Sequence, residues 1–112
     1  VYPAYTVVAE KYQAMVSLGM VNTRLKDYFD LWVLMKHVSF DPNILREAIA
    51  ATFARRKTPM PQELPLGLSG AFTLDATKIT QWKAFLSKNK LQAPPLDELV
   101  SELRPLLWGN NA

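Results

Sequence analysis

The sequence predicts an all-α fold, a small bundle of about five helices. Apolar residues recur at spacings of three and four along most of the 112-residue chain, and no segment shows the alternation of a strand. Asp41-Pro42 and Asp75 are typical helix starts, because an acidic side chain caps the first backbone amides. Hydrophobic residues make up 49% of the chain and charged residues 21%, which is enough for one core without disulfides.

The first two helices are expected to be close neighbours. Apolar spacing predicts a helix over residues 6–18, and Gly19 can adopt the left-handed conformation that ends it. A second helix is expected to run to residue 37, with Asn22 or Thr23 as its N-cap. A connection this short places consecutive helices side by side and antiparallel.

The middle of the second helix and the start of the third carry further signals. Residues 31–35 are five apolar residues in succession, which predicts a helix surrounded by others at the centre of the core. A third helix is expected over residues 42–57, with Asp41 as its cap and Pro42 in its first turn.

The second half of the chain is expected to hold two more helices. Residues 58–74 are rich in proline and glycine and predict a stiff surface connection. A fourth helix is expected over residues 75–88, and a fifth over residues 95–109 with a kink at Pro105. The expected organisation is one helical domain, residues 1–112: helices in 1–57, a connection in 58–74 and a helical pair in 75–112.

Composition excludes several kinds of site. Cysteine is absent and only one histidine is present, which excludes disulfides, thiol catalysis and cysteine- or histidine-rich metal sites. Four glycines leave little material for a phosphate-binding loop. No apolar run approaches the roughly 18 residues that cross a bilayer, and the start has no signal-peptide pattern, so we expect a cytoplasmic protein without membrane contact. Because the chain starts at Val1, we expect a piece of a longer protein.

Lys11 is the first candidate for a functional residue, because it could bind an anion. Its neighbours three and four positions away on the first helix are all apolar: Val7, Val8, Ala14 and Met15. A lysine in such surroundings either extends to water or meets an anion. Spacing alone leaves both interpretations open.

Asp27 and Asp30 lie three residues apart, so they share a face of the second helix. In the simplest interpretation the helix dipole favours acids in the first turn, and Arg24 and Lys26 neutralise them. In an antiparallel hairpin, however, both acids would come level with Lys11. The resulting cluster is expected either to hold a triphosphate and help place Mg²⁺, or to form a buried ion pair.

Two segments carry a resemblance to a known family. Residues 9–15 read Ala-Glu-Lys-Tyr-Gln-Ala-Met, and residues 24–31 read Arg-Leu-Lys-Asp-Tyr-Phe-Asp-Leu. Together, at this spacing, they resemble the two C-terminal motifs of the AbiEii/AbiGii nucleotidyltransferase toxin family. Tyr2-Pro3, Phe53-Ala54-Arg55-Arg56 and Thr58-Pro59 are also similar to that family. The likeness is strong over residues 1–60 and extends over the rest.

The resemblance implies the C-terminal helical domain of a polymerase β-like nucleotidyltransferase toxin from a bacterial abortive-infection or toxin–antitoxin system. Such enzymes bind a nucleoside triphosphate with Mg²⁺ and transfer nucleotides to an RNA acceptor such as tRNA. Their expected partners are the N-terminal nucleotidyltransferase domain, which carries the catalytic palm, and a cognate antitoxin.

Carried onto this sequence, the motifs imply that Lys11 contacts the nucleotide's phosphates and that Asp27 completes the active site. Glu10, Arg24, Lys26 and Asp30 would be supporting motif positions. The chain departs from the family's pattern in having no Asp-x-Asp motif and no Gly-Ser pair. We therefore expect it to hold no metal by itself, to bind neither NTP nor Mg²⁺ alone, and to be inactive without the palm.

One further hypothesis stays open. A net charge of +3 and the run Arg55, Arg56 and Lys57 are compatible with a non-enzymatic helical module that binds protein or RNA. These three cations are the expected nucleic-acid contacts outside the hairpin.

Overall fold

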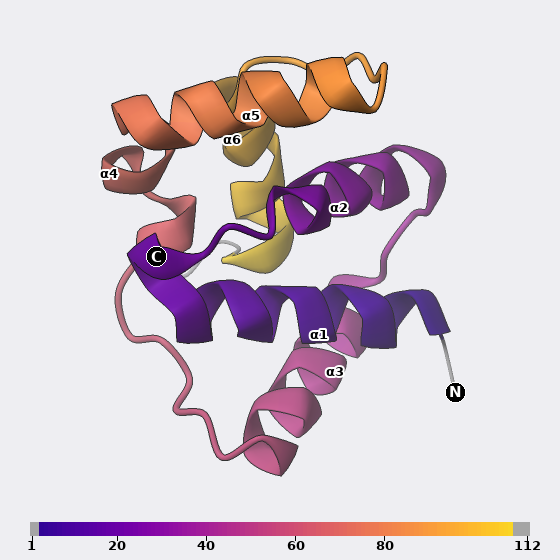
Figure 1. The fold of residues 1–112 in the computed structure, drawn as a ribbon. Helices are drawn as coiled ribbons and strands as arrows, with labels where there is room; N and C mark the ends of the chain where they lie inside the picture. Colours follow the sequence, from indigo (N-terminus) through magenta and orange to yellow (C-terminus); the bar gives the residue numbers. More distant parts are fainter. Residues whose placement is uncertain (1–2, 109–112) are drawn as a thin grey trace.

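The computed structural model describes residues 3–108, and in this range the chain is helical without strands, which confirms the all-α prediction (Figure 1). The elements within these residues are α1 (Pro3–Leu18), the 3-10 turn η1 (Gly19–Val21), α2 (Leu25–His37), α3 (Pro42–Arg55), the 3-10 turn η2 (Leu66–Leu68), α4 (Gly70–Thr73), α5 (Ala76–Lys88) and α6 (Leu96–Leu107). None of these helices combines the length and the hydropathy required of a membrane span.

Local capping determines where several helices begin. The Asp41 carboxylate accepts hydrogen bonds from the backbone amides of Asn43 and Ile44, at 2.8 and 3.2 Å, and so starts α3 as predicted. Asp75 accepts from the Lys78 amide at 3.1 Å and starts α5 in the same way.

The connection between α1 and α2 differs from the prediction. Gly19 has the expected left-handed backbone (φ +54°), but the chain continues from it into η1. The N-cap of α2 is Arg24, without a side-chain cap, so the prediction of Asn22 or Thr23 as the cap is wrong. The Asn22 side chain instead accepts a hydrogen bond from the Arg24 amide at 2.8 Å, outside the helix.

Helix α1 lies at the centre of the molecule, with α3 packed beneath it and α2 above it in Figure 1. Its inward face carries Val8, Ala9, Tyr12 and Met15, which are fully buried. The prediction that residues 31–35 form the centre of the core is wrong, because Leu31 is buried but the four residues after it are partly exposed. Only one side of α2 faces the core.

Residues 66–73 are also not the surface connection that their composition predicts. They form η2 and α4, and Leu68 and Phe72 are completely buried. At the end of the chain, α6 continues through Pro105 to Leu107. Gly109, the expected end of this helix, lies outside the described residues.

Candidate functional site

Helices α1 and α2 run in opposite directions, and this brings Lys11 to both acids of α2 (Figure 1). The Lys11 Nζ lies 2.9 Å from Asp27 Oδ1 and 3.3 Å from Asp30 Oδ2. The predicted convergence of the amine with two carboxylates is therefore confirmed. Of the two interpretations of Lys11, its meeting an anion is the correct one.

The ion pairs of this cluster differ in exposure and therefore in strength. The Asp27 side chain is 8% exposed and that of Lys11 20%, so water screens their interaction weakly. Lys26 Nζ lies 2.7 Å from Asp30 Oδ2 but is largely exposed, and such surface pairs contribute little to stability. The hydrogen bond and the charge of Asp30 raise the pKa of Lys26.

Asp27 has an oxygen whose bonding capacity is not used. Its Oδ2 atom is buried and accepts no hydrogen bond from the described residues, although Arg24 Nε lies 3.1 Å away. Arg24 therefore neutralises Asp27 by proximity rather than by a directed bond.

Glu10 precedes Lys11 in the sequence but faces α3. Its Oε1 accepts a hydrogen bond from Arg56 Nε at 2.7 Å, and its Oε2 pairs with the Arg55 guanidinium. Two of the expected nucleic-acid contacts are thus engaged by one carboxylate. The third, Lys57, is exposed and follows α3 with a left-handed backbone (φ +53°).

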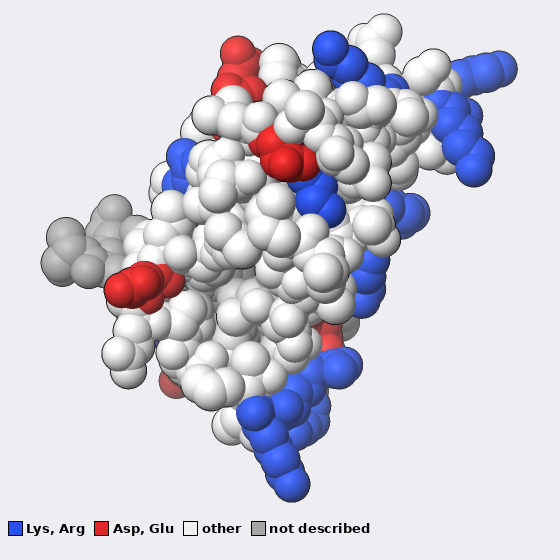
Figure 2. Space-filling model, turned by 60° about the vertical axis from the view of Figure 1, so that its left-hand side comes forward, with Lys and Arg blue, Asp and Glu red and all other residues white. Residues whose placement is uncertain are grey.

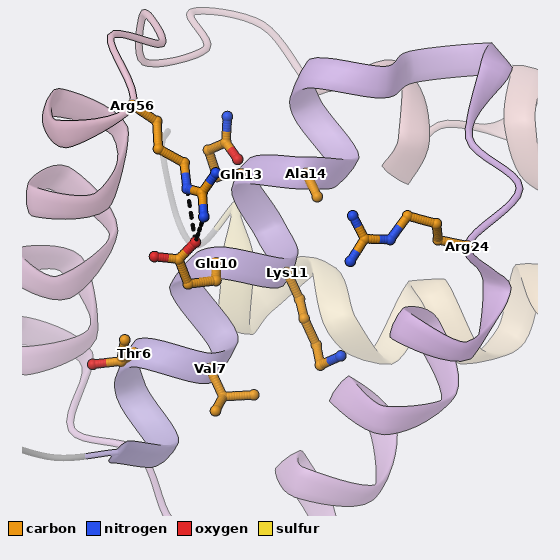
Figure 3. A pocket seen from close by; sticks show the side chains of 8 residues that line it. All are labelled: Thr6, Val7, Glu10, Lys11, Gln13, Ala14, Arg24 and Arg56. Carbon is orange, nitrogen blue, oxygen red and sulfur yellow. Dashed lines mark hydrogen bonds and ion pairs between the residues drawn. The ribbon is translucent and has the colours of Figure 1, made fainter.

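A hollow of about 400 Å³ opens on the surface beside Lys11 and is called the Lys11 hollow below. Its lining residues are Thr6, Val7, Glu10, Lys11, Gln13, Ala14, Arg24 and Arg56. In Figure 3, Arg56 reaches it from the end of α3 and Arg24 from the start of α2, on either side of α1. Sequence reasoning missed Thr6 and Gln13, which are uncharged and lie outside any charge pattern.

The charge around the Lys11 hollow favours an anionic ligand. Among residues 3–108, its ion-pair networks contain five cations and only three carboxylates. Figure 2 shows Lys and Arg side chains gathered along one edge of the molecule. Phosphate groups match such a site, because arginine and lysine donate charge-assisted hydrogen bonds to them.

The same donor set does not fit Mg²⁺, which requires free carboxylate or carbonyl oxygens. Asp27 and Asp30 each have two cations within 3.3 Å. Over residues 3–108, no three His, Cys, Asp or Glu side chains come together as a metal site.

A family model described as "Nucleotidyl transferase AbiEii toxin, Type IV TA system" matches residues 1–102. The match includes α1, α2, α3 and every residue that lines the Lys11 hollow. No curated protein and no solved structure matches the chain.

Proposed function

This chain belongs to the AbiEii family of nucleotidyl transferase toxins of type IV toxin–antitoxin systems, and from that membership we propose that it is the helical C-terminal domain of an enzyme that transfers nucleotides from an NTP to an RNA acceptor such as tRNA. The family's place in such systems implies a cognate antitoxin. The observation that supports the proposal best is the cation-rich Lys11 hollow beside the Lys11–Asp27 pair.

In this proposal Lys11 binds the phosphates of the NTP. An ammonium group has three N–H donors. Asp27 and Asp30 engage at most two of them, so at least one remains for a phosphate oxygen. Asp27 orients the amine, because its side chain is 8% exposed and lies in the first turn of α2. Arg24 and Arg56 would contact other phosphate oxygens from opposite sides of the hollow.

We assign Mg²⁺ to the N-terminal nucleotidyltransferase domain rather than to this chain. The ion neutralises the charge that develops during phosphoryl transfer. Because two cations lie within 3.3 Å of each of Asp27 and Asp30 and would repel a metal ion, this chain contributes phosphate binding and orientation only. By itself it should not transfer nucleotides.

The test is nucleotide transfer by the full-length protein, measured with labelled NTP and tRNA. Lys11→Ala and Asp27→Ala should each reduce transfer by roughly 100-fold or more, the usual effect of losing a charge-stabilising donor. Lys36→Ala and Asp97→Ala are matched controls, because both residues are exposed and lie away from the hollow. Helical circular dichroism should be unchanged in all four variants. Full transfer by both Lys11→Ala and Asp27→Ala would refute the assignment.

Lys11→Met separates phosphate binding from a purely structural ion pair. Methionine keeps most of the aliphatic stem but has no charge. If the cluster were only structural, the variant would lose stability, because Asp27 is left without its lysine, but the folded protein would keep its activity. In the proposed role the folded variant loses transfer activity as well.

A further inference from the structure

Lys78 is a buried lysine that the Lys11 hollow does not use. Its residue is 5% exposed, and no carboxylate lies within ion-pair distance of it in the described part of the chain. Its Nζ donates a hydrogen bond to the backbone oxygen of Asn22 at 2.6 Å and lies 4.9 Å from the centre of the Phe72 ring. A buried ammonium is costly without partners, so these contacts bind the start of α5 firmly to the α1–α2 connection.

Asn22 links this contact with Lys78 to the start of α2. It is 1% exposed, and its backbone amide donates to Gly19 O at 3.2 Å. Its side-chain Oδ1 accepts the hydrogen bond of the Arg24 amide at 2.8 Å. Arg24 is the N-cap of α2 and has no side-chain cap of its own, so Asn22 orients the residue from which the helix begins.

Arg24 connects the start of α2 to the Lys11 hollow, because its side chain lines that hollow. Its Nε lies 3.1 Å from Asp27 Oδ2, and its side chain lines the hollow opposite Arg56. An ion pair without a directed hydrogen bond holds this guanidinium on Asp27, so its reach into the hollow also depends on where the backbone places Arg24. The Asn22 side chain holds the Arg24 amide, and the Lys78 amine holds the Asn22 carbonyl.

We propose that Lys78 and Asn22 are positioning residues for phosphate binding: Lys78 fixes the α1–α2 connection through the Asn22 carbonyl, and Asn22 fixes Arg24 at the rim of the Lys11 hollow. This inference rests on the proposed function of the hollow. It adds a residue from α5, far from both motifs in the sequence, to the phosphate-binding apparatus.

The experiment measures binding of inorganic tripolyphosphate to the full-length protein by calorimetry, which needs no knowledge of the preferred base. Asn22→Ala removes the acceptor for the Arg24 amide but keeps the carbonyl that Lys78 uses. Lys78→Met removes the buried donor. Each should weaken binding by about 3- to 10-fold, the equivalent of one hydrogen bond. Lys83→Met, an exposed lysine of the same helix, makes the same change in charge and should have no effect.

A double-mutant cycle distinguishes positioning from a general loss of stability. In an Arg24→Ala background, Asn22→Ala should weaken tripolyphosphate binding no further, because the residue it positions has lost its guanidinium. An equal loss in both backgrounds would overturn the inference. If Lys78→Met does not fold, the Asn22→Ala cycle decides alone.

The outcomes also separate this inference from the proposed function. If Lys11→Ala binds tripolyphosphate as tightly as the unmodified protein, the proposed function fails. If Lys11→Ala weakens binding while Asn22→Ala and Lys78→Met do not, the proposed function stands and the positioning role is wrong.

Discussion

The hydroxyl of Tyr28 donates a hydrogen bond of 2.8 Å to the backbone oxygen of Gly67, a residue 39 positions away. Tyr28 follows Asp27 directly in α2, is completely buried and stacks on Phe72, with ring centres 5.3 Å apart. The bond therefore joins the helix that carries the site acids to the segment around η2 and α4.

The first prediction concerns space at Gly67. A Cβ atom there would lie 2.8 Å from the Tyr28 hydroxyl, too close for either to stay in place. Gly67→Ala should lower the free energy of unfolding by about 2 kcal/mol, as overpacking of a core does. Urea denaturation measures this change. Gly70→Ala is the control, because a Cβ there meets only Leu74 at an ordinary 3.6 Å.

Tyr28→Phe tests the cause of this loss, since it removes the hydroxyl that the new methyl group meets. Alone, Tyr28→Phe should cost about 1 kcal/mol through the lost hydrogen bond. Combined with Gly67→Ala, the total loss should be smaller than the sum of the two single losses. Strict additivity would mean that the methyl group clashes elsewhere.

The second prediction is loss of stability at alkaline pH. Burial raises the pKa of Tyr12 from 10.0 to about 12, and burial together with the Asp27 charge also raises the pKa of Tyr28. Below pH 10 both tyrosines are protonated in the folded and unfolded states, so their contribution to the free energy of unfolding is fully present. Above pH 10 only the unfolded state loses these protons, so stability falls as pH rises, by at most about 1.4 kcal/mol per pH unit for each tyrosine.

Urea titrations from pH 8 to 12 measure this dependence. Tyr12→Phe and Tyr28→Phe should each make the decline above pH 10 shallower. The unsubstituted protein is the comparison. Identical slopes in all three proteins would contradict the prediction.

The third prediction concerns two lysines with left-handed backbones. Lys57 (φ +53°) and Lys90 (φ +54°) follow α3 and α5, where glycine is the favoured residue. Lys57→Gly and Lys90→Gly should each raise the free energy of unfolding by about 0.5 kcal/mol, because relief of strain exceeds the added entropy of the unfolded glycine. Thermal melts in matched buffers measure this gain.

The same pair of variants tests the nucleic-acid contact. Both lose one positive charge, but only Lys57 adjoins Arg55 and Arg56. Lys57→Gly should weaken tRNA binding to the full-length protein by about 2-fold at low salt, and Lys90→Gly should not. Equal affinities for the two variants would exclude Lys57 as a contact.

The fourth prediction is that Glu10 restrains the arginines of α3. Glu10→Gln removes the charge that engages Arg55 and Arg56 and should strengthen tripolyphosphate binding by roughly 2- to 5-fold at low ionic strength. The gain should vanish near 1 M salt, where the screening length falls to about 3 Å. Glu47→Gln, an exposed change of equal charge on α3, is the control. An equal gain from Glu47→Gln would show that net charge alone is responsible.

The sequence predicted the features that depend on neighbouring residues. Asp41 and Asp75 start their helices because each carboxylate reaches backbone amides two or three residues ahead. The meeting of Lys11 with Asp27 was also predictable, since a short connection and the helical period place them level. Each of these relationships is confined to one helix end or one hairpin.

Features that depend on tertiary packing were not predictable. Leu68 and Phe72 are buried although their segment is rich in proline and glycine, because η2 and α4 pack against other elements. Arg56 reaches the Lys11 hollow only because α3 packs along α1. Lys78 reads in the sequence as an ordinary solvated lysine, and nothing in its neighbourhood predicts its bond to Asn22, 56 residues away.

The α1–α2 connection determines how α2 is placed against α1, and therefore whether its acids meet Lys11. A residue added or removed within residues 19–24 would separate Asn22 from the Lys78 amine or from the Arg24 amide and so displace the start of α2. That displacement would move Asp27 and Asp30 away from Lys11, although both motifs would be intact in the sequence. In this family an insertion or deletion at that point should therefore be as damaging as the loss of a motif residue, whereas substitutions that preserve the connection's length and the Asn22 contacts should be tolerated.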